Sequence, residues 1–490
     1  MRAITMPKTM IAALCLTAAA PSFALDLMQA WRAALANDAQ LASARAQLQA
    51  TRERVPQARA GLLPAVSATA AMNRNSIDTN VTSTRTYTSE SYGIQAAYPL
   101  LRLQNVEAFE QSKLAVAIDE AQLEQANQDL ALRVSQAYFD LLAAQDNVET
   151  IRAQMRAISE QLAAAIRNFE VGTATITDQQ EAQARYDLAV AQEIAAGNEL
   201  EVRRAALAQL IGQPVGELNV LRPGVALEGP QPARESEWID NARENNLLVQ
   251  QQRVASEIAR REIERQRYGH YPTVDVVGLL GRNENAAFNQ VGIRSHSAVV
   301  GVQLSIPLYV GGAIDAAVRE AAATHSRSLS DLENVRRLAE QNARQAYLGL
   351  NSGLAQVRAL EAAERSSRLA LDSNLLGYQV GVRINIDVLN AQQQLFSTQR
   401  DLARARYDSL LNGLRLKSTA GALGEDDVAR INALLVPPPP REEGLGTPPP
   451  SPPPAPAPAP APQGESKSKA GTPVPGLRVP PQPGSRVTKP

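Results

Sequence analysis

The feature that most constrains this chain is an internal repeat of about 208 residues. Residues 169–183 read FEVGTATITDQQEAQ and residues 378–392 read YQVGVRINIDVLNAQ, so a Val-Gly pair and an aspartate recur in register. Further pairs lie at almost the same offset: Ala34 and Ala242, Gly61 and Gly269, Pro64 and Pro272, Pro99 and Pro307, Tyr138 and Tyr347. So many coincidences at one offset indicate two copies of one structural unit.

Each copy opens with a helical pattern. In the first copy, residues 25–59 are rich in alanine with apolar residues at helical spacing, and Gly61 and Pro64 then interrupt the pattern. The sequence therefore predicts one helix of about 35 residues in this place.

Two stretches of alternating polarity follow in each copy. In the first copy the apolar positions are Val66, Ala68, Ala70, Met72, Tyr92, Ile94, Ala96, Tyr98 and Leu100. In the second copy the corresponding face is more apolar still, with Val300, Val302, Leu304, Ile306 and Leu308. A period of two predicts β-strands, two in each copy. Strands with one apolar face and one small or polar face are typical of transmembrane β-barrels.

The longest predicted element follows the second strand. Residues 101–171 contain neither glycine nor proline, and their continuous helical pattern predicts a helix of about 65 to 70 residues, about 100 Å long. After a turn at Gly172, Thr177 is a candidate N-cap with Gln180 three residues later. The helix that starts there is predicted to end near Leu210.

The helix lengths indicate how each copy packs. The two shorter helices, placed end to end, match the long one, so each copy is predicted to form two long antiparallel columns. Abundant alanine and an aromatic content of only 4% fit helices that pack closely, as in coiled coils. Four strands cannot close a barrel, because open edges leave backbone donors unpaired in lipid. Several chains must therefore combine; three would supply twelve strands, and the residues alone leave other oligomers open.

The two ends of the chain differ from the repeats. A basic start and a short apolar run predict a signal peptide over residues 1–24, cleaved after Ala24. The one cysteine, Cys15, lies inside that segment. Residues 437–490 are rich in proline, which predicts an extended, disordered tail.

Composition and motifs argue against several classes of protein. A net charge of −1 gives no basic excess for binding nucleic acid. His270, His296 and His325 lack metal-ligand spacing, and no nucleophile elbow or Gly-rich phosphate loop is present. The sequence therefore predicts neither an enzyme nor a metal or cofactor site.

Several segments resemble the TolC family of outer-membrane efflux proteins, namely FEVGTATITDQQEAQARYDLA, LLGYQVGVRINIDVLNAQ, ARARYDSLLNGLRLKSTAGAL and LSIPLYVGGAIDAAVREA. The resemblance extends from Leu25 to about Leu435. It implies an α+β homotrimer in the outer membrane of a Gram-negative bacterium. Its twelve-stranded β-barrel, with four strands per chain, would continue into a long α-helical coiled-coil tunnel in the periplasm.

The same resemblance divides the chain into parts. Repeat 1 would span residues 25–211 and repeat 2 residues 237–420. An equatorial domain around the middle of the tunnel would combine residues 212–236 with residues 421–436. The barrel would meet the tunnel near four prolines, Pro64, Pro99, Pro272 and Pro307.

The resemblance also implies a function. The chain would form a passive exit duct of a tripartite export system, for type I secretion, multidrug efflux or both. The duct would open when docked to a periplasmic adaptor and an inner-membrane ABC, RND or MFS transporter, and outer-membrane lipid would surround the barrel. The alternative is a periplasmic coiled-coil scaffold or adhesin without a pore, against which the four strands argue. The exported substrate stays open.

Two features of the periplasmic tip follow from the resemblance. The repeated Val-Gly would form the tip turns, where Gly172 and Gly381 adopt a backbone conformation without a Cβ penalty. Asp387 would face the pore axis, where three carboxylates in a ring raise one another's pKa and attract cations. Relatives with two acidic rings carry a second aspartate where this chain has Asn390, so we expect weaker cation selectivity and weaker block by divalent cations.

The closed tip is expected to depend on polar contacts between the two copies. By resemblance, Tyr378 and Arg383 of the second copy would reach Thr177 and Asp178 of the first. A bond between Arg383 and Asp178 would be charge-assisted and therefore stronger than a neutral one.

Overall fold

The computed structural model describes residues 24–78, 80 and 83–438. The predicted signal peptide, apart from Ala24, and the predicted tail, apart from residues 437–438, lie outside the described residues. Among the described helices, none has the length and apolarity that a membrane crossing requires.

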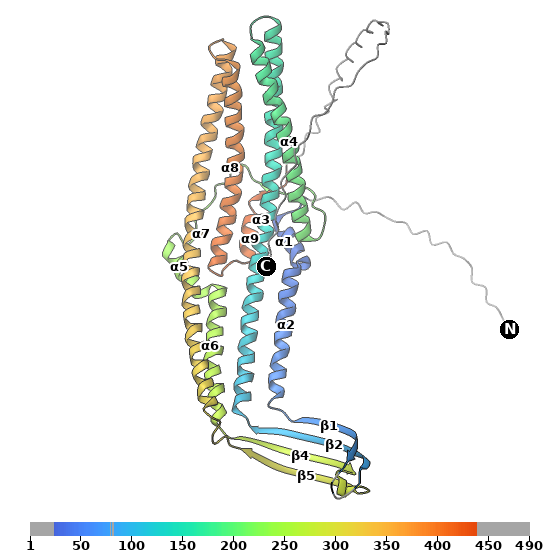
Figure 1. Cartoon of the computed structure of the whole chain (residues 1–490). Coiled ribbons are helices and arrows are strands. Elements are labelled where there is room, and N and C mark those ends of the chain that lie inside the picture. The colour runs from blue at the N-terminus through green and yellow to red at the C-terminus, as the bar shows by residue number, and fades with distance from the viewer. Residues whose placement is uncertain (1–23, 79, 81–82, 439–490) are drawn as a thin grey trace, which may run out of the picture. The chain divides into compact units, whose positions relative to one another are not determined.

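The described residues form two successive sets of helices and strands (Figure 1). The first set consists of α1 (Leu27–Asn37), α2 (Ala39–Ala60), β1 (Ala65–Ile77), β2 (Arg85–Leu101), α3 (Leu103–Glu170) and α4 (Ile176–Ile211). The second consists of α5 (Glu235–Asn245), α6 (Leu247–Arg267), β4 (Thr273–Glu284), β5 (Arg294–Ser305), α7 (Ala313–Gln379) and α8 (Asn385–Thr419). The structure also contains β3 (Val220–Leu221), α9 (Glu425–Asn432), β6 (Leu435–Val436) and short 3-10 helices at Tyr268–His270 and Phe288–Gln290.

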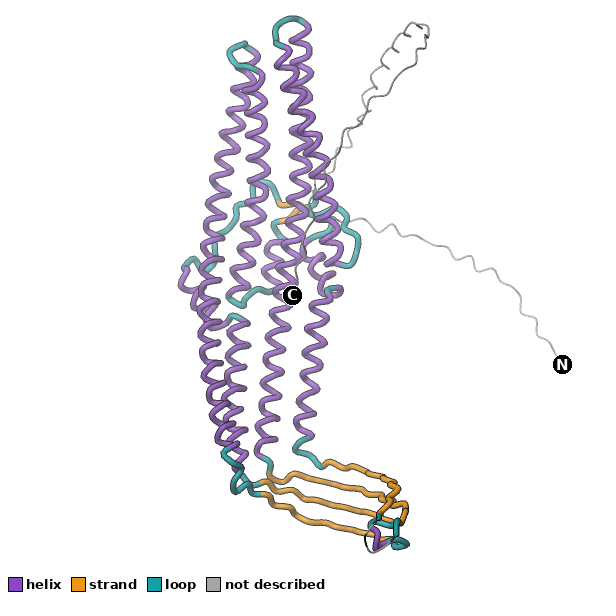
Figure 2. Tube along the Cα trace, viewed as in Figure 1, coloured by secondary structure: helices purple, strands orange, loops and turns teal. Residues whose placement is uncertain are grey.

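Both sets follow the same order, so the predicted repeat is confirmed. Helices α3 and α7 contain 68 and 67 residues, and α4 and α8 contain 36 and 35. At 1.5 Å per residue, each long helix is about 100 Å in length, as the sequence predicts. Figure 2 shows the four strands at one end of the helices and the two turns of the helical hairpins at the other.

The first predicted helix is wrong in one respect, because it is broken at Asp38. The backbone N–H of Asp38 closes α1 by bonding to Ala34, and the Asp38 carboxylate accepts the backbone N–H of Leu41 at 2.8 Å to begin α2. Asn246 makes the corresponding break in the second copy, between α5 and α6. Aspartate and asparagine favour such a position because their short side chains replace the missing backbone partners.

The four long strands form one antiparallel sheet in the order β1-β2-β4-β5. The register pairs Ala68 with Ile94, Ile94 with Leu280, and Leu280 with Ala298. Residues opposite one another in an antiparallel pair share a face, so the predicted apolar positions within the strands line one face of the sheet. Ile306 and Leu308, predicted to continue that face, lie beyond the end of β5. Strands β1 and β5 are its edges, and within the described chain neither edge is paired.

Each long helix packs against a column of shorter helices. Helix α3 contacts α1 and α2 over one part of its length and α4 over the other, and α7 contacts α5, α6 and α8 in the same way. The predicted pair of long columns in each copy is therefore confirmed (Figure 1). Contacts of α3 with α6 and with α8 hold the two copies together.

A mixed region of short strands and helices surrounds the middle of the long helices. Strand β3 pairs with β6, and Leu25 forms a parallel bridge with Leu218. The hydroxyl of Tyr138, which is fully buried on α3, lies 3.0 Å from the carbonyl oxygen of Leu25 and 2.9 Å from that of Asn219. The largest apolar core of the described chain gathers here, with contributions from α1, α3, α4, α8 and α9.

Candidate functional site

The two hairpin turns have the same backbone design. Gly172 has φ +78° and Gly381 has φ +79°, and nothing lies within 4 Å of a Cβ built at either position. The backbone N–H of Thr173 bonds to the carbonyl of Asn168 at 2.8 Å, and that of Val382 bonds to Gly377 at 2.9 Å. Both glycines thus occupy the left-handed region, as the sequence predicts, and close their helices with the same pattern of bonds.

The two helices that follow these turns begin differently. Thr175, and not Thr177, is the N-cap of α4, so the predicted cap at Thr177 is wrong. Thr175 and Asp178 form a capping box, in which the Asp178 carboxylate accepts the Thr175 backbone N–H at 2.9 Å and its hydroxyl at 2.7 Å. Ile384 is the N-cap of α8, and its side chain makes no capping hydrogen bond.

Within the chain, Tyr378 and Arg383 do not contact Thr177 and Asp178 as expected. Arg383, in the turn before α8, lies 3.6 Å from Asp387 of that helix, whereas Asp178 is engaged in its capping box. The Tyr378 hydroxyl accepts a hydrogen bond from the Asn168 side chain at 3.1 Å, and that bond joins α3 to α7. The structure therefore pairs Arg383 and Tyr378 with residues other than those expected.

A residue that the sequence did not single out joins the copies most tightly. Asn385 is 1% exposed at the first position of α8. It accepts a hydrogen bond from Gln161 of α3 at 2.6 Å and donates one to the backbone carbonyl of Asp178 at 3.1 Å. Its side chain therefore links three helices, and both ends of its amide are satisfied.

One turn further along α8, Asn390 has a partner in the first copy. Arg185 of α4 donates to Asn390 at 3.0 Å and also bonds to Gln393. Asp387 is half-buried and Asn390 is exposed. The side-chain amide of Asn390 is therefore held by an arginine of the first copy.

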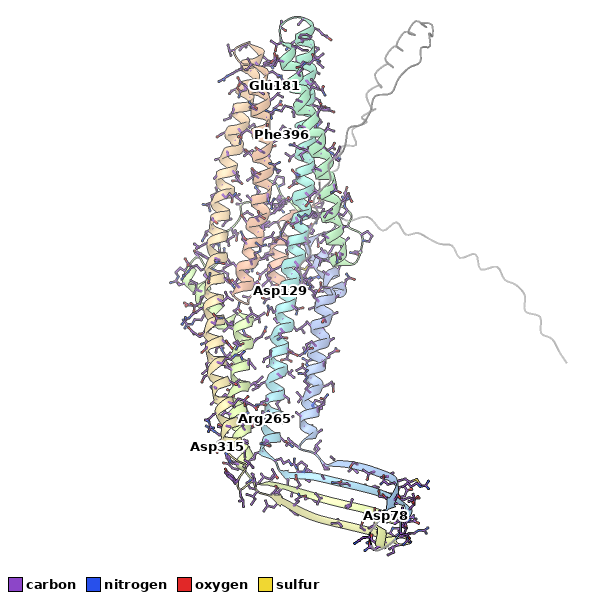
Figure 3. The ribbon with its side chains drawn as sticks, viewed as in Figure 1. Asp78, Asp129, Glu181, Arg265, Asp315 and Phe396 are labelled. Carbon is purple, nitrogen blue, oxygen red and sulfur yellow. The ribbon has the colours of Figure 1, made fainter. Side chains whose placement is uncertain are left out.

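Apolar packing and a cavity lie beside these polar links. Leu389 of α8 packs with Ile158 of α3 and with Ala182 and Ala189 of α4. Next to this cluster is a cavity of about 150 Å³, lined by both polar and apolar side chains. One of the apolar ones is Phe396 of α8, which Figure 3 labels on the helices below the turns. The two hairpins are thus joined near their turns by polar and apolar contacts, with a cavity beside them.

A second link between the hairpins lies nearer the middle of the helices. The Tyr407 hydroxyl on α8 donates to the Asp146 carboxylate on α3 at 2.7 Å, and Phe139 stacks on the Tyr407 ring with centroids 5.6 Å apart. Burial raises the pKa of Asp146 to about 6, against the lowering effect of the Tyr407 hydrogen bond. Asp146 therefore changes charge near neutral pH while it holds two helices together.

The opposite end of the helices meets the sheet at the four predicted prolines. Pro64 and Pro272 immediately precede β1 and β4, and Pro307 follows β5. Pro99 lies in β2, beside a shift of register against β4. There, Arg102 makes two bonds to Asp275, at 2.9 and 2.7 Å, which fix the start of α3 to the sheet.

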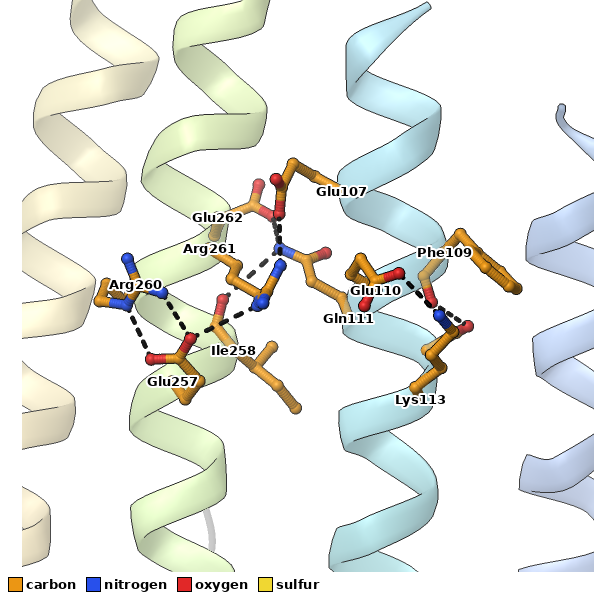
Figure 4. A network of polar contacts seen from close by, with 11 residues as sticks. Glu107, Phe109, Glu110, Gln111, Lys113, Glu257, Ile258, Arg260, Arg261 and Glu262 are labelled. Atoms are coloured by element: carbon orange, nitrogen blue, oxygen red, sulfur yellow. Dashed lines mark hydrogen bonds and ion pairs between the residues drawn. The ribbon is translucent and has the colours of Figure 1, made fainter.

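Polar contacts also hold α3 against α6 close to this junction. Arg261 pairs with Glu107 at 3.2 Å, and Gln111 donates to Glu262 at 3.0 Å (Figure 4). These contacts connect the first copy to the second on the sheet side of the middle region. The two copies are therefore joined both near the sheet and near the hairpin turns.

Comparison with known proteins agrees with this architecture. The family model described as outer membrane efflux protein matches residues 30–213 and 238–422, one match to each repeat. Outer membrane protein TolC of Vibrio cholerae is 32% identical, covering 84% of this chain and 94% of that protein. Alkaline protease secretion protein AprF of Pseudomonas aeruginosa is 33% identical, covering 85% and 88%. The CmeC outer membrane channel of Campylobacter jejuni shares the fold, with a TM-score of 0.70 and 16% identity over 88% of this chain and 97% of that chain.

These matches define the class as an outer-membrane protein of an export system. The chain belongs to the outer membrane efflux protein family, as its resemblance to TolC indicated. Its location is the outer membrane of a Gram-negative bacterium, and the pore-free scaffold is not favoured.

Proposed function

We propose that three copies of this chain form a continuous duct that carries exported material through the outer membrane. The four-stranded sheet of each copy would contribute to a twelve-stranded barrel. The helices, about 100 Å long, would extend that barrel as a tunnel into the periplasm. The equatorial domain would be built from residues 212–236 and 421–436, around the middle of the tunnel.

The observation that carries this proposal is the sheet. One face exposes large apolar side chains, with Val300 at 85% and Val302 at 68% exposure, and both edge strands lack a partner within the described chain. Exposed apolar surface of this kind is stable in lipid, and open edges are not. Joining the edge strand β5 of one chain to the edge strand β1 of the next pairs the open edges and leaves the apolar face in contact with lipid.

The hairpin turns are the proposed gate of the duct. Asp387 would contribute one carboxylate from each copy to a ring at the constriction, with Asn390 one turn further along. Contacts between neighbouring chains of the trimer would come from residues beside the turns, namely Tyr378, Arg383, Thr177 and Asp178. Within each chain, Asn385 would hold the second hairpin against the first, because its hydrogen bonds run from α8 to α3 and α4.

Opening requires partners that supply energy, since a duct has no energy source of its own. We infer a periplasmic adaptor and an inner-membrane transporter of the ABC, RND or MFS type. The similarity to AprF, a protease secretion protein, and to TolC supports a tripartite system of this kind.

Conductance across a planar lipid bilayer tests the proposal. The purified protein should give discrete conductance steps and should stay in membranes washed with carbonate or urea. Release by the wash, or an absence of steps from protein shown to be folded and inserted, would exclude a duct. A protein with only a scaffolding role predicts both of those results.

A further inference from the structure

The charged residues of the sheet have an unusual distribution. At the end of the strands farthest from the helices, near Asp78 in Figure 3, the apolar face carries a group of charges. The members of this group are Arg74, Glu90, Arg282, Glu284 and Arg294. The opposite face carries uncharged residues in the neighbouring row, Ala71, Ser91, Asn283 and Ser295.

The strand register fixes this arrangement. One row across the sheet consists of Ala70, Tyr92, Arg282 and His296, and the next consists of Met72, Glu90, Glu284 and Arg294. Both rows continue the apolar face, since they lie an even number of residues from its members. The charges therefore point to the side that the proposed barrel turns toward lipid.

Their distance from the other end of the apolar face is within about 5 Å of the height of the apolar band of such barrels. From Leu304 to His296 the strand covers about 26 Å at 3.3 Å per residue, which a tilt of about 40° reduces to about 20 Å across the membrane. The apolar band of such barrels is about 25 Å tall and ends in aromatic residues. Tyr92 lies in the first charged row, so these rows coincide with the outer boundary of the hydrocarbon.

The arginines of the group are accessible. Arg294 pairs with Glu284 at 2.8 Å, yet its side chain is 64% exposed, and that of Arg282 is 48% exposed and 3.9 Å from the same carboxylate. Arg74 is exposed and makes no ion pair among the described residues. Within the strands, three guanidinium groups therefore outnumber two carboxylates on a surface bordered by apolar residues, and Asp78 follows the end of β1.

We propose that Arg74, Arg282 and Arg294 bind the phosphate groups of acylated glycolipids in the outer leaflet of the outer membrane. The inference rests on the proposed barrel, which turns this face toward lipid. Guanidinium groups bind phosphate with two parallel hydrogen bonds, and the apolar rows beside them accept acyl chains. A free phosphate ion would use the same arginines but not the apolar rows.

Lipid binding to the purified full-length protein tests the proposal. Native mass spectrometry in a neutral detergent would compare bisphosphorylated lipid A with lipid A from which the phosphates have been removed. The variant with Arg74→Gln, Arg282→Gln and Arg294→Gln should bind the phosphorylated lipid at least roughly tenfold more weakly. The control variant with Arg54→Gln, Arg156→Gln and Arg327→Gln loses the same charge from exposed helix positions and should bind as the wild type does.

A second variant gives a result of opposite sign. Glu90→Gln with Glu284→Gln removes the competing carboxylates and should strengthen binding, which a folding defect would not do. Equal binding of both lipids by the wild type, or an unchanged preference in the arginine variant, would overturn the proposal. Displacement of the lipid by millimolar inorganic phosphate would overturn the assignment to lipid. The two proposals fail in different experiments. An absence of conductance would exclude the duct, whereas a protein that conducts but binds both lipids equally would exclude only the lipid site.

Discussion

The buried side chain of Asn385 accepts a hydrogen bond from Gln161 at 2.6 Å and thereby fastens α8 to α3 beside the hairpin turns. Near the turns the same two hairpins also share a small apolar cluster beside a cavity of about 150 Å³. Bonds from Asn168 to Tyr378 and from Arg185 to Asn390 join them as well. Removing the amide from such a position leaves polar groups without partners, which costs about 1 to 3 kcal/mol for each group.

The first prediction concerns this residue. Asn385→Ala should weaken the attachment of the second hairpin, because Gln161 and the carbonyl of Asp178 lose their partner. In a planar bilayer we expect larger or longer openings than in the wild type, by roughly tenfold in open probability. Asn374→Ala is the control, since the Asn374 side chain bonds within its own helix, to Ala370 at 3.0 Å. Equal openings in Asn385→Ala and the wild type would contradict the role given to Asn385.

The second prediction concerns Asp387. Asp387→Asn should lower the preference for cations over anions several-fold, because it neutralises the proposed ring of carboxylates. Reversal potentials in a salt gradient measure this preference. Asp372→Asn, at an exposed position of α7, removes the same charge elsewhere and should leave the preference unchanged.

The third prediction concerns pH and the buried pair of Asp146 and Tyr407. The folded-state pKa of Asp146, about 6, lies above its ordinary value of 3.8, so the folded protein binds more protons between these values than the unfolded chain. Stability contributed by this group is therefore present at low pH and is lost as pH rises through 6. Its loss amounts to about 2 to 3 kcal/mol.

Asp146→Asn removes the charge and should raise the unfolding midpoint more at pH 7.5 than at pH 4.5, where most of the folded protein already carries the proton. Thermal unfolding at the two pH values measures the effect. Asp408→Asn, beside Tyr407 but with a side chain 57% exposed, is the matched control and should alter neither midpoint. An equal change at both pH values would show that Asp146 acts through packing alone.

The fourth prediction concerns the break between α1 and α2. Asp38 caps α2 and pairs with Arg133 at 3.0 Å; burial raises its pKa, but these bonds outweigh burial and lower it overall. Asp38→Ala should lower the free energy of unfolding by about 2 kcal/mol through loss of the cap and of the charge-assisted bond. Asp38→Asn should lower it by less than half as much, since Asn246 performs the same capping in the second copy. Denaturant titration distinguishes the two, and equal losses would exclude a capping role.

Much of the fold was predictable because its signals are local. Long runs without glycine or proline predict α3, alternating polarity predicts the strands, and the paired Val-Gly predicts turns with positive φ. The N-cap of α4 is an exception, because the prediction was Thr177 and the structure has Thr175, which lies at the same spacing from Asp178 as Thr177 does from Gln180. The sequence alone could not choose between them.

The sequence by itself determined the repeat, the lengths of the long helices, the polarity of the two sheet faces and the backbone of the turns, because these depend on residues near one another in the chain. Only the tertiary structure decided that Asn385 is buried against Gln161, that Asn168 bonds to Tyr378, and that Tyr407 meets Asp146. Those partners are set by how one helix lies against another, and a small rotation of a long helix exchanges one set of polar neighbours for another.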